Sequence, residues 1–170
     1  HPFFVNFTTA DYGAHNRNFD ILSDDHGRVY VANFEGLLCY DQSKWTVIHA
    51  PGIFRITRLY KDHNGRIWVG GYNVFGYLSS ANNGELKLNT VFSRDNKGFI
   101  GEVTGISEEG GKICIETSIG TAGLEDKSMD GYKIVKTPSD NPQLYSGVKI
   151  NKSIKLSDGS TVLATAGLGV

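Results

Sequence analysis

Tyr60 to Leu78 read Tyr-Lys-Asp-His-Asn-Gly-Arg-Ile-Trp-Val-Gly-Gly-Tyr-Asn-Val-Phe-Gly-Tyr-Leu, which is the pattern of a β-hairpin. A polar segment, Asp62 to Gly65, separates two apolar runs, and Asp and Gly residues are typical of a tight reversal. The run Ile67-Trp68-Val69 is β-branched and aromatic and contains no polar residue. We therefore expect both faces of this strand to be covered.

The same pattern recurs along the chain and is anchored on a glycine in each turn. The anchors are Gly27, Gly65, Gly111 and Gly159. The fourth residue after each anchor is aliphatic: Val31, Val69, Ile115 and Leu163. The fifth residue before each anchor is also apolar: Leu22, Tyr60, Ile106 and Ile154. A unit of about 40 to 50 residues with four short strands is typical of a β-propeller blade.

The sequence thus predicts an all-β fold, a β-propeller fragment of four-stranded antiparallel blades. In the first blade we expect strands over 19–23, 28–32, 37–41 and 45–48. The polar segment 9–18 is expected to be a loop, either a ligand rim or a solvated connector. The predicted parts are a closing strand over 3–8, blade 1 over 19–48, blade 2 over 54–92, blade 3 over 103–135 and half of blade 4 over 148–170.

Composition narrows the class of protein. The 170 residues include 21 Gly, which is typical of a β protein with many turns. The formal net charge is -1 and the sequence has no basic stripe, so we do not expect nucleic acid as a partner. There is no apolar run of ~18 residues, so we expect no membrane contact by this segment. Cys39 and Cys114 fall in predicted strands of different blades, where we expect two buried free thiols.

The residues that usually carry chemistry give no catalytic pattern. The five histidines lack metal-ligand spacing, and neither a nucleophile elbow nor a phosphate-binding glycine loop occurs. Asp24, Asp25 and Asp62 lie in turns, and an EF-hand loop would need further oxygen ligands and a closing Glu. We therefore expect no catalytic residue, no metal and no cofactor.

Three motifs carry a family resemblance. Asp24 to Val31 and Asp62 to Val69 share Asp-x-x-Gly-Arg-(Val/Ile)-(Tyr/Trp)-Val, and Gly36 to Asp41 read Gly-Leu-Leu-x-Tyr-Asp. Before the first blade, Asn6 to Asn16 contain Asn-Phe-Thr-x-x-Asp-Tyr-Gly-x-x-Asn. Together these motifs resemble the two-component-regulator propeller repeats of Bacteroides-like bacteria, which form the periplasmic sensor regions of hybrid sensor kinases and related membrane-anchored regulators.

The resemblance implies a function for the chain and for its parent protein. It implies a periplasmic sensor of oligosaccharides from glycan breakdown, whose parent is anchored in the inner membrane and signals to a histidine kinase or a DNA-binding output. The segment itself would not be an enzyme. Two alternatives stay open: a protein-binding scaffold, and a glycan-active enzyme, because Ser23 to Tyr30 are similar to the Asp-box turn of sialidase-type propellers.

Loops after the second strand of each blade, and loops between blades, gather on one face of a propeller, where recognition usually occurs. The ligand-contact residues predicted on this argument combine an aromatic surface with polar groups: Asn33, Glu35, Arg55, Tyr72 and Asn73.

Propellers close with about 4 to 8 blades, more than this sequence supplies. We therefore expect the chain to be the N-terminal part of a longer sensor and to pack against its remaining blades. We also expect the isolated piece to self-associate through unpaired strand edges, with residues 3–8 of one copy against 148–170 of another.

The repeat also predicts the core. Residues expected to be buried between blades are Tyr30, Val31, Ile67, Trp68, Val69, Ile113, Ile115 and Leu163. Replacing Trp68 by Ala should lower the free energy of unfolding by on the order of 3 to 5 kcal/mol, because a large enclosed side chain leaves a cavity. Urea unfolding measures this loss, and a change below ~1 kcal/mol would contradict the repeat assignment.

Overall fold

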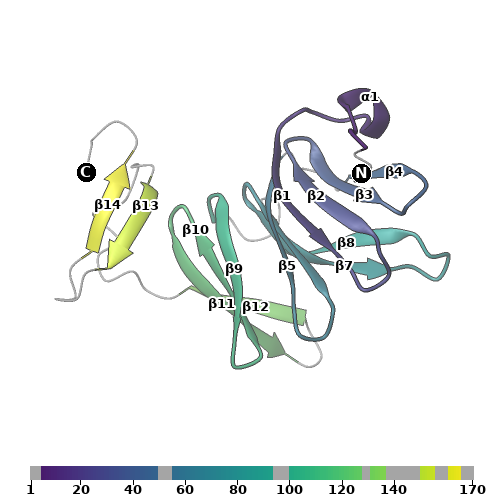
Figure 1. The fold of residues 1–170 in the computed structure, drawn as a ribbon. Helices are drawn as coiled ribbons and strands as arrows, with labels where there is room; N and C mark the ends of the chain where they lie inside the picture. The colour runs from purple at the N-terminus through teal and green to yellow at the C-terminus, as the bar shows by residue number, and fades with distance from the viewer. Residues whose placement is uncertain are drawn as a thin grey trace.

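The structure is a computed structural model that describes residues 5–49, 55–93, 100–127, 131–136, 150–155 and 161–165. It contains three four-stranded antiparallel sheets and one two-stranded hairpin, each with its strands in chain order (Figure 1). The first sheet contains β1 (Asn18–Ser23), β2 (Val29–Asn33), β3 (Gly36–Tyr40) and β4 (Trp45–Ile48). The second contains β5 (Ile56–Lys61), β6 (Ile67–Gly71), β7 (Val74–Ser80) and β8 (Leu86–Ser93).

The third sheet contains β9 (Val103–Glu109), β10 (Lys112–Thr117), β11 (Gly120–Lys127) and β12 (Gly131–Lys136). The hairpin contains β13 (Ile150–Lys155) and β14 (Thr161–Thr165). The predicted all-β propeller fold of four-stranded blades is therefore confirmed. In the first sheet, each predicted strand end lies within one residue of the observed end.

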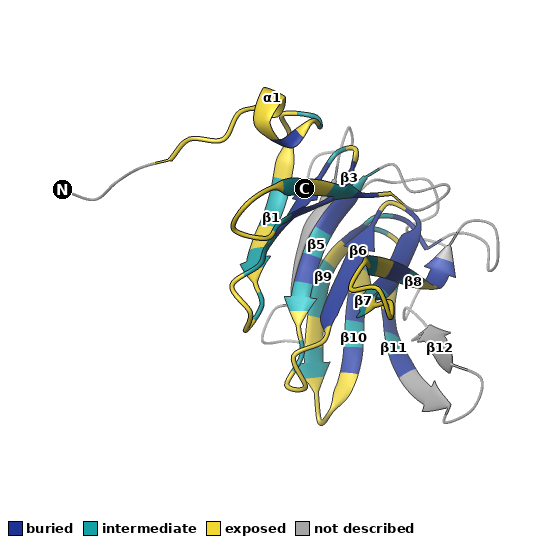
Figure 2. Ribbon diagram, turned by 90° about the vertical axis from the view of Figure 1, so that its right-hand side faces the viewer, coloured by how far each residue is buried: buried dark blue, intermediate teal, exposed yellow. Residues whose placement is uncertain are grey.

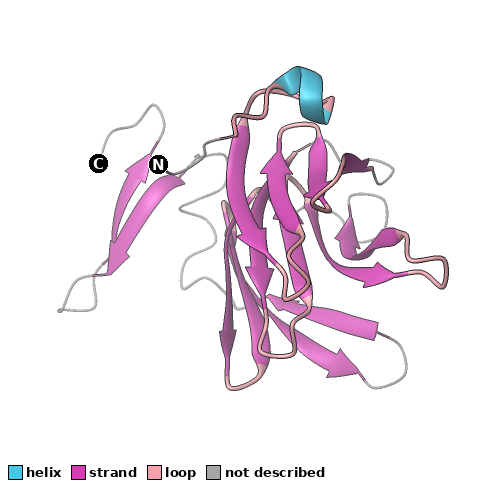
Figure 3. Ribbon diagram, turned by 45° about the vertical axis from the view of Figure 1, so that its right-hand side comes forward, coloured by secondary structure: helices cyan, strands magenta, loops and turns pink. Residues whose placement is uncertain are grey.

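The segment before the first sheet differs from the prediction. Residues 5–8 form no strand, so the predicted closing strand is wrong there; residues 3 and 4 lie outside the described part of the chain. The next residues form a short helix, α1 (Thr9–Tyr12), where a loop was expected (Figure 3). The carboxylate of Asp11 caps this turn by accepting hydrogen bonds from the Thr8 backbone amide at 2.6 Å and hydroxyl at 2.8 Å.

An aromatic cluster attaches this segment to the first sheet. Phe7 lies 5.1 Å from Tyr40 and 5.3 Å from Trp45, measured between ring centroids, and Tyr12 lies 5.7 Å from Trp45. Side-chain packing therefore holds Phe7 and Tyr12 against the first sheet, whereas strand pairing was predicted for residues 3–8. The alternation of apolar and polar residues in the sequence does not distinguish attachment by side-chain packing from attachment by strand pairing.

Strands of neighbouring sheets are buried where the sheets face one another (Figure 2). Successive residues of β6 belong to different core clusters, so its side chains alternate between the two sides of the second sheet. Ile67 and Val69 pack toward the first sheet, and Trp68 packs toward the third. Burial between sheets is confirmed for six of the predicted core residues: Tyr30, Ile67, Trp68, Val69, Ile113 and Ile115. Val31 is also buried, but it packs with Tyr12 and Leu38 on the outer face of the first sheet. The burial of Leu163 lies outside what the structure describes. Cys39 and Cys114 are free thiols as expected, although only Cys39 is fully buried.

A carboxylate closes the turn between β1 and β2. Asp24 Oδ1 accepts hydrogen bonds from the backbone amides of His26 and Arg28, both at 2.9 Å. Asp24 Oδ2 accepts from the Tyr30 hydroxyl at 3.0 Å. Burial alone raises the pKa of Asp24, but these hydrogen bonds outweigh it and leave the pKa below its usual value. Burial, followed by the bond to Asp24, raises the pKa of Tyr30 to about 12.

The turn between β5 and β6 has the same arrangement. Asp62 Oδ1 accepts from the amides of Asn64 at 3.0 Å and Arg66 at 2.9 Å. Asp62 Oδ2 accepts from Trp68 Nε1 at 2.9 Å. We call the arrangements at Asp24 and Asp62 the aspartate clamps. Each clamp joins a turn to an aromatic side chain buried between sheets.

The third sheet departs from this pattern. Its β9–β10 turn consists of Gly110 and Gly111, both with positive φ, which two-residue hairpins favour. Glu108, in the position of the clamp aspartate, accepts from the His63 backbone amide at 3.1 Å and also contacts the His63 ring. A carboxylate that closes a turn in the first two sheets therefore connects two sheets here. Cys114 replaces the aromatic residue.

The first strand of every sheet contains a β-bulge at the same place. The bulged residues are Phe19, Thr57, Thr104 and Asn151. Beside these bulges the sheets bond to one another: Leu59 N donates to Asp20 Oδ2 at 2.9 Å, and Thr57 Oγ1 donates to the carbonyl of Val103 at 2.7 Å. Gly70 permits this approach, because a Cβ there would lie 2.5 Å from Val103 Cγ1.

Replacing Asp24 by Ala should lower the free energy of unfolding at neutral pH by about 1 to 3 kcal/mol, because the Tyr30 hydroxyl and two amides lose their acceptor. Since folding lowers the pKa of Asp24, this stabilisation is present above the unfolded-state pKa of about 3.9 and is lost as pH falls through the folded-state value. Urea unfolding at a series of pH values measures both effects.

Asp25→Ala is the matched control. Asp25 is the neighbouring residue, is exposed and pairs with Lys61 at 2.9 Å, so its loss should cost less than about 1 kcal/mol. Equal losses in the two variants, or a pH-independent loss at Asp24, would contradict the clamp.

Candidate functional site

One end of the sheets brings together equivalent parts of three blades. It is formed by the β2–β3, β6–β7 and β10–β11 turns and the residues that enter β1, β5 and β9. The same backbone bond recurs in each: Phe34 N donates to Arg17 O at 3.1 Å, Tyr72 N to Arg55 O at 2.9 Å, and Ser118 N to Glu102 O at 2.8 Å. We call this end the turn face and treat these three pairs as equivalent positions.

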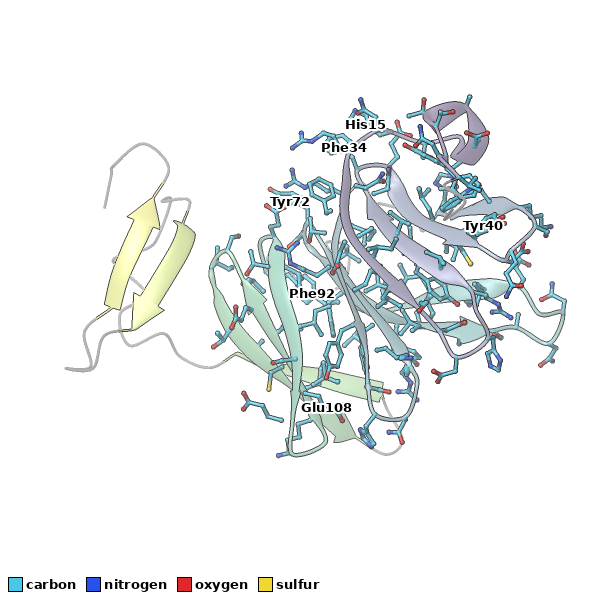
Figure 4. The ribbon with its side chains drawn as sticks, in the orientation of Figure 1. His15, Phe34, Tyr40, Tyr72, Phe92 and Glu108 are labelled. Atoms are coloured by element: carbon cyan, nitrogen blue, oxygen red, sulfur yellow. The ribbon has the colours of Figure 1, made fainter. Side chains whose placement is uncertain are left out.

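In the first two sheets the paired positions hold an arginine and an aromatic residue. The Arg55 guanidinium carbon lies 5.3 Å from the Tyr72 ring centroid, and that of Arg17 lies 5.6 Å from the Phe34 centroid. Both distances suit a cation–π contact. The His15 ring packs 4.9 Å from Phe34, so further ring surface lies beside it (Figure 4).

The third sheet presents different chemistry at the same positions. Glu102 replaces the arginine, Ser118 replaces the aromatic residue, and Ser118 Oγ accepts from the Glu102 amide at 3.0 Å. The Glu102 carboxylate lies 3.4 Å from the Arg55 guanidinium, so the second and third sheets are joined by an ion pair. The turn face is therefore cationic and aromatic over the first two sheets and acidic over the third.

The structure places three of the five predicted ligand-contact residues on this surface. Tyr72 is 46% exposed, Glu35 is exposed, and Arg55 is partly buried. Arg55 Nε is buried and has no hydrogen-bond partner among the described residues. Tyr72 and Arg55 are in direct contact, which their separation in the sequence does not reveal.

Asn33 and Asn73 are buried, and this corrects the prediction that they are placed to contact a ligand. Asn33 Nδ2 donates to His15 O and to Asn18 Oδ1, and its Oδ1 accepts from the Glu35 amide. Asn73 Oδ1 accepts from the Ile100 amide at 2.7 Å. Both side chains satisfy backbone groups in loops and so hold the turn face in shape.

Arg17 and Phe34 were not among the five predicted residues, although Arg17 lies in the segment considered as a ligand rim. A signal was present in the sequence. Arg17 precedes Phe34 by as many residues as Arg55 precedes Tyr72, so the repeat contains a spaced arginine–aromatic pair.

Two clefts lie away from the turn face. A cleft of about 680 Å³ opens between the first and second sheets, and Lys44, His49 and Glu85 are among the residues that line it. A second cleft of about 260 Å³ lies beside the Asp24 and Gly65 turns. None of the five predicted residues lines either cleft.

Within the described ranges, no group of three or more His, Cys, Asp or Glu side chains is placed to hold a metal ion. In the same ranges, no helix has the length and apolar character needed to cross a membrane.

Four-stranded antiparallel sheets in chain order, packed face to face, define the β-propeller class. The sequence of residues 53–73 matches a family model described as "Two component regulator propeller". The resemblance predicted from the motifs is confirmed over this repeat. The chain has no match among the curated protein sequences compared with it.

Solved structures with the same fold cover nearly the whole chain. The extracellular domain of a protein assigned as the hybrid two component system BT3049 of B. thetaiotaomicron aligns with a TM-score of 0.58 and 17% identity, over 97% of this chain and 21% of that one. The extracellular domain assigned to the one component system BT4673 of the same organism gives 0.58 and 18%, over 94% and 22%. The chain therefore spans about a fifth of these two structures.

A streptogramin B lyase aligns with a TM-score of 0.56 and 20% identity, over 95% of this chain and 57% of the lyase. At these identities the alignments show the propeller fold. The fold is thus found both in regulator domains and in an enzyme.

Replacing Asn73 by Ala should lower the free energy of unfolding by about 1 to 3 kcal/mol, because the buried Ile100 amide loses its acceptor. Asn73 has φ 56°, so Asn73→Gly should cost less than Asn73→Ala by about 1 kcal/mol. Tyr72→Ala is the control and should change stability by less than about 1 kcal/mol. Thermal and urea unfolding of the three variants measure these differences, and a neutral Asn73→Ala would show that the residue is dispensable to the loop.

Proposed function

We propose that the chain is a ligand-sensing propeller module of a periplasmic signal-transduction regulator, and that it binds oligosaccharides from glycan breakdown at the turn face. The observation that carries this proposal is the repeated arginine–aromatic pair, Arg55 with Tyr72 and Arg17 with Phe34. Aromatic surface suits the apolar faces of sugar rings, and arginine supplies several fixed donors for hydroxyl groups.

The comparisons support the sensor part of the proposal. Two of the aligned structures are extracellular domains of regulators, and the family model that matches residues 53–73 is named for regulators. Oligosaccharide as the ligand rests on the chemistry of the turn face and on the resemblance of the motifs. The kinase or DNA-binding output, and the anchor in the inner membrane, belong to the proposed parent protein.

We further propose that other blades of the parent cover the outer face of the first sheet. Val31 and Leu38 are buried on that face together with Tyr12 of α1, whereas Ile21 is 66% exposed. An exposed aliphatic side chain on a sheet face is a site for association. The same exposure supports self-association of the isolated chain.

The alternatives have definite tests. A glycan-active enzyme would consume the oligosaccharide, so the products of an overnight incubation distinguish an enzyme from a sensor. A protein-binding scaffold would bind no sugar and would capture a protein partner. Fold alone does not choose among them, since one fold can support many functions.

Calorimetric titration with defined neutral and acidic oligosaccharides from plant and animal polysaccharides tests the proposal. Tyr72→Ala and Arg55→Gln should each weaken the binding of the best ligand about tenfold or more, because each removes a desolvated contact worth at least ~1.4 kcal/mol. Saturable binding without turnover is expected.

Phe7→Ala is the matched control. Phe7 is a partly exposed aromatic residue that packs against Tyr40. Tyr40 lies away from Tyr72 (Figure 4). Its replacement should leave the affinity unchanged. Affinities that are the same in the Tyr72 and Arg55 variants as in the original protein would remove the turn face as the binding site.

A further inference from the structure

Arg17 is the most exposed basic group of the turn face and is held by two rings. Its guanidinium carbon lies 5.6 Å from the centroids of both Phe19 and Phe34. Within the described ranges the guanidinium forms no ion pair and donates no hydrogen bond. The two ring contacts restrict the side chain, while its N–H donors are left for another molecule.

Other arginines of the second sheet are already engaged. Arg55 pairs with Glu102, and Arg58 donates to the carbonyls of Thr104 at 2.8 Å and Thr57 at 2.6 Å. Arg66 lies over the Trp68 and Tyr77 rings at 5.8 and 4.8 Å, at the opposite end of the β5–β6 hairpin.

A planar guanidinium binds a carboxylate or a sulfate through two parallel hydrogen bonds, and a side chain that is already ordered loses less entropy on binding. Glu102 disfavours an anion over the third sheet, and its carboxylate already forms an ion pair with Arg55. Glu35, in the turn that contains Phe34, forms no ion pair with Arg17. The position on the turn face best prepared for an anionic group is therefore Arg17.

We infer that the oligosaccharide carries an acidic residue, with a carboxylate or sulfate group, and that Arg17 is the residue that selects it. This inference rests on the proposed function and makes it more specific. Neutral sugar residues would extend along Tyr72, toward the acidic third sheet. Arg17 is then a specificity-determining residue, and Phe19 and Phe34 position its guanidinium.

The test follows the arginine Nε–Hε signals of the ¹⁵N-labelled chain by NMR during titration with trigalacturonic acid. Its fully methyl-esterified form is the neutral probe of matched shape, and glucose 6-sulfate distinguishes sulfate from carboxylate recognition. The acid should shift the Arg17 signal saturably and bind about tenfold more tightly than the ester. Arg17→Gln should abolish this preference, Arg17→Lys should restore part of it, and Phe34→Leu should reduce it.

Arg66→Gln is the control, because Arg66 also stacks on rings but lies at the opposite end of the hairpin. It should leave the preference unchanged. If trigalacturonic acid and its methyl ester bound with equal affinity and changed the chemical shifts of the Tyr72 amide, the inference would be overturned and the proposed function would stand. A preference that survives Arg17→Gln, or that is lost equally in Arg66→Gln, would also overturn it. No saturable shift at Arg17 with any probe overturns it too, whereas the proposed function is judged separately by the oligosaccharide titration.

Discussion

The aspartate clamps are the interaction on which the rest of the structure depends. Trp68 is buried between the second and third sheets, where an indole N–H without an acceptor would cost free energy of desolvation. Asp62 supplies that acceptor and at the same time satisfies two amides of its turn. The carboxylate thus joins the reversal of the chain to the packing of one sheet on the next. Asp24 does the same for the Tyr30 hydroxyl, so two successive blades each contain the same kind of polar contact.

The clamps fix one end of the first hairpin in each of the first two sheets, and the opposite end of the sheets carries different side chains in different blades. There, one backbone hydrogen bond per blade keeps the entering residue beside the β2–β3, β6–β7 or β10–β11 turn. The side chains on this constant frame differ between blades, with arginine and an aromatic residue in two and Glu102 with Ser118 in the third. Because of this difference the turn face is chemically asymmetric although the blades repeat. An asymmetric surface can bind an asymmetric ligand in a single orientation.

Much of the fold could be predicted because its signals are local. Asp and Gly mark the reversals, and the apolar residues around Gly65 recur around Gly27, so strands and core residues followed from short patterns. Residues 5–8 were misassigned because pairing at a sheet edge depends on a partner that sequence does not identify. Asn33 and Asn73 were misjudged for a similar reason: an amide after a strand has the same sequence context whether it faces solvent or caps a buried backbone group. The contact of Glu108 with His63 joins two blades and was likewise invisible in either repeat alone.

The β-bulges in the first strand of each sheet affect how such a chain can evolve. Beside them, Thr57 and Arg58 of the second sheet donate to the main-chain carbonyls of Val103 and Thr104. A carbonyl is present whatever the side chain, so this part of the junction makes little demand on the identity of the neighbouring residues. A blade can therefore be duplicated, and its copy can accumulate substitutions, while these joints persist. Gly70 is the counterpart that remains constrained, because any larger residue would collide with Val103. The sequences of the blades can thus diverge along the strands and turns, but they are restricted at the few positions where the backbone of one sheet lies close to the next.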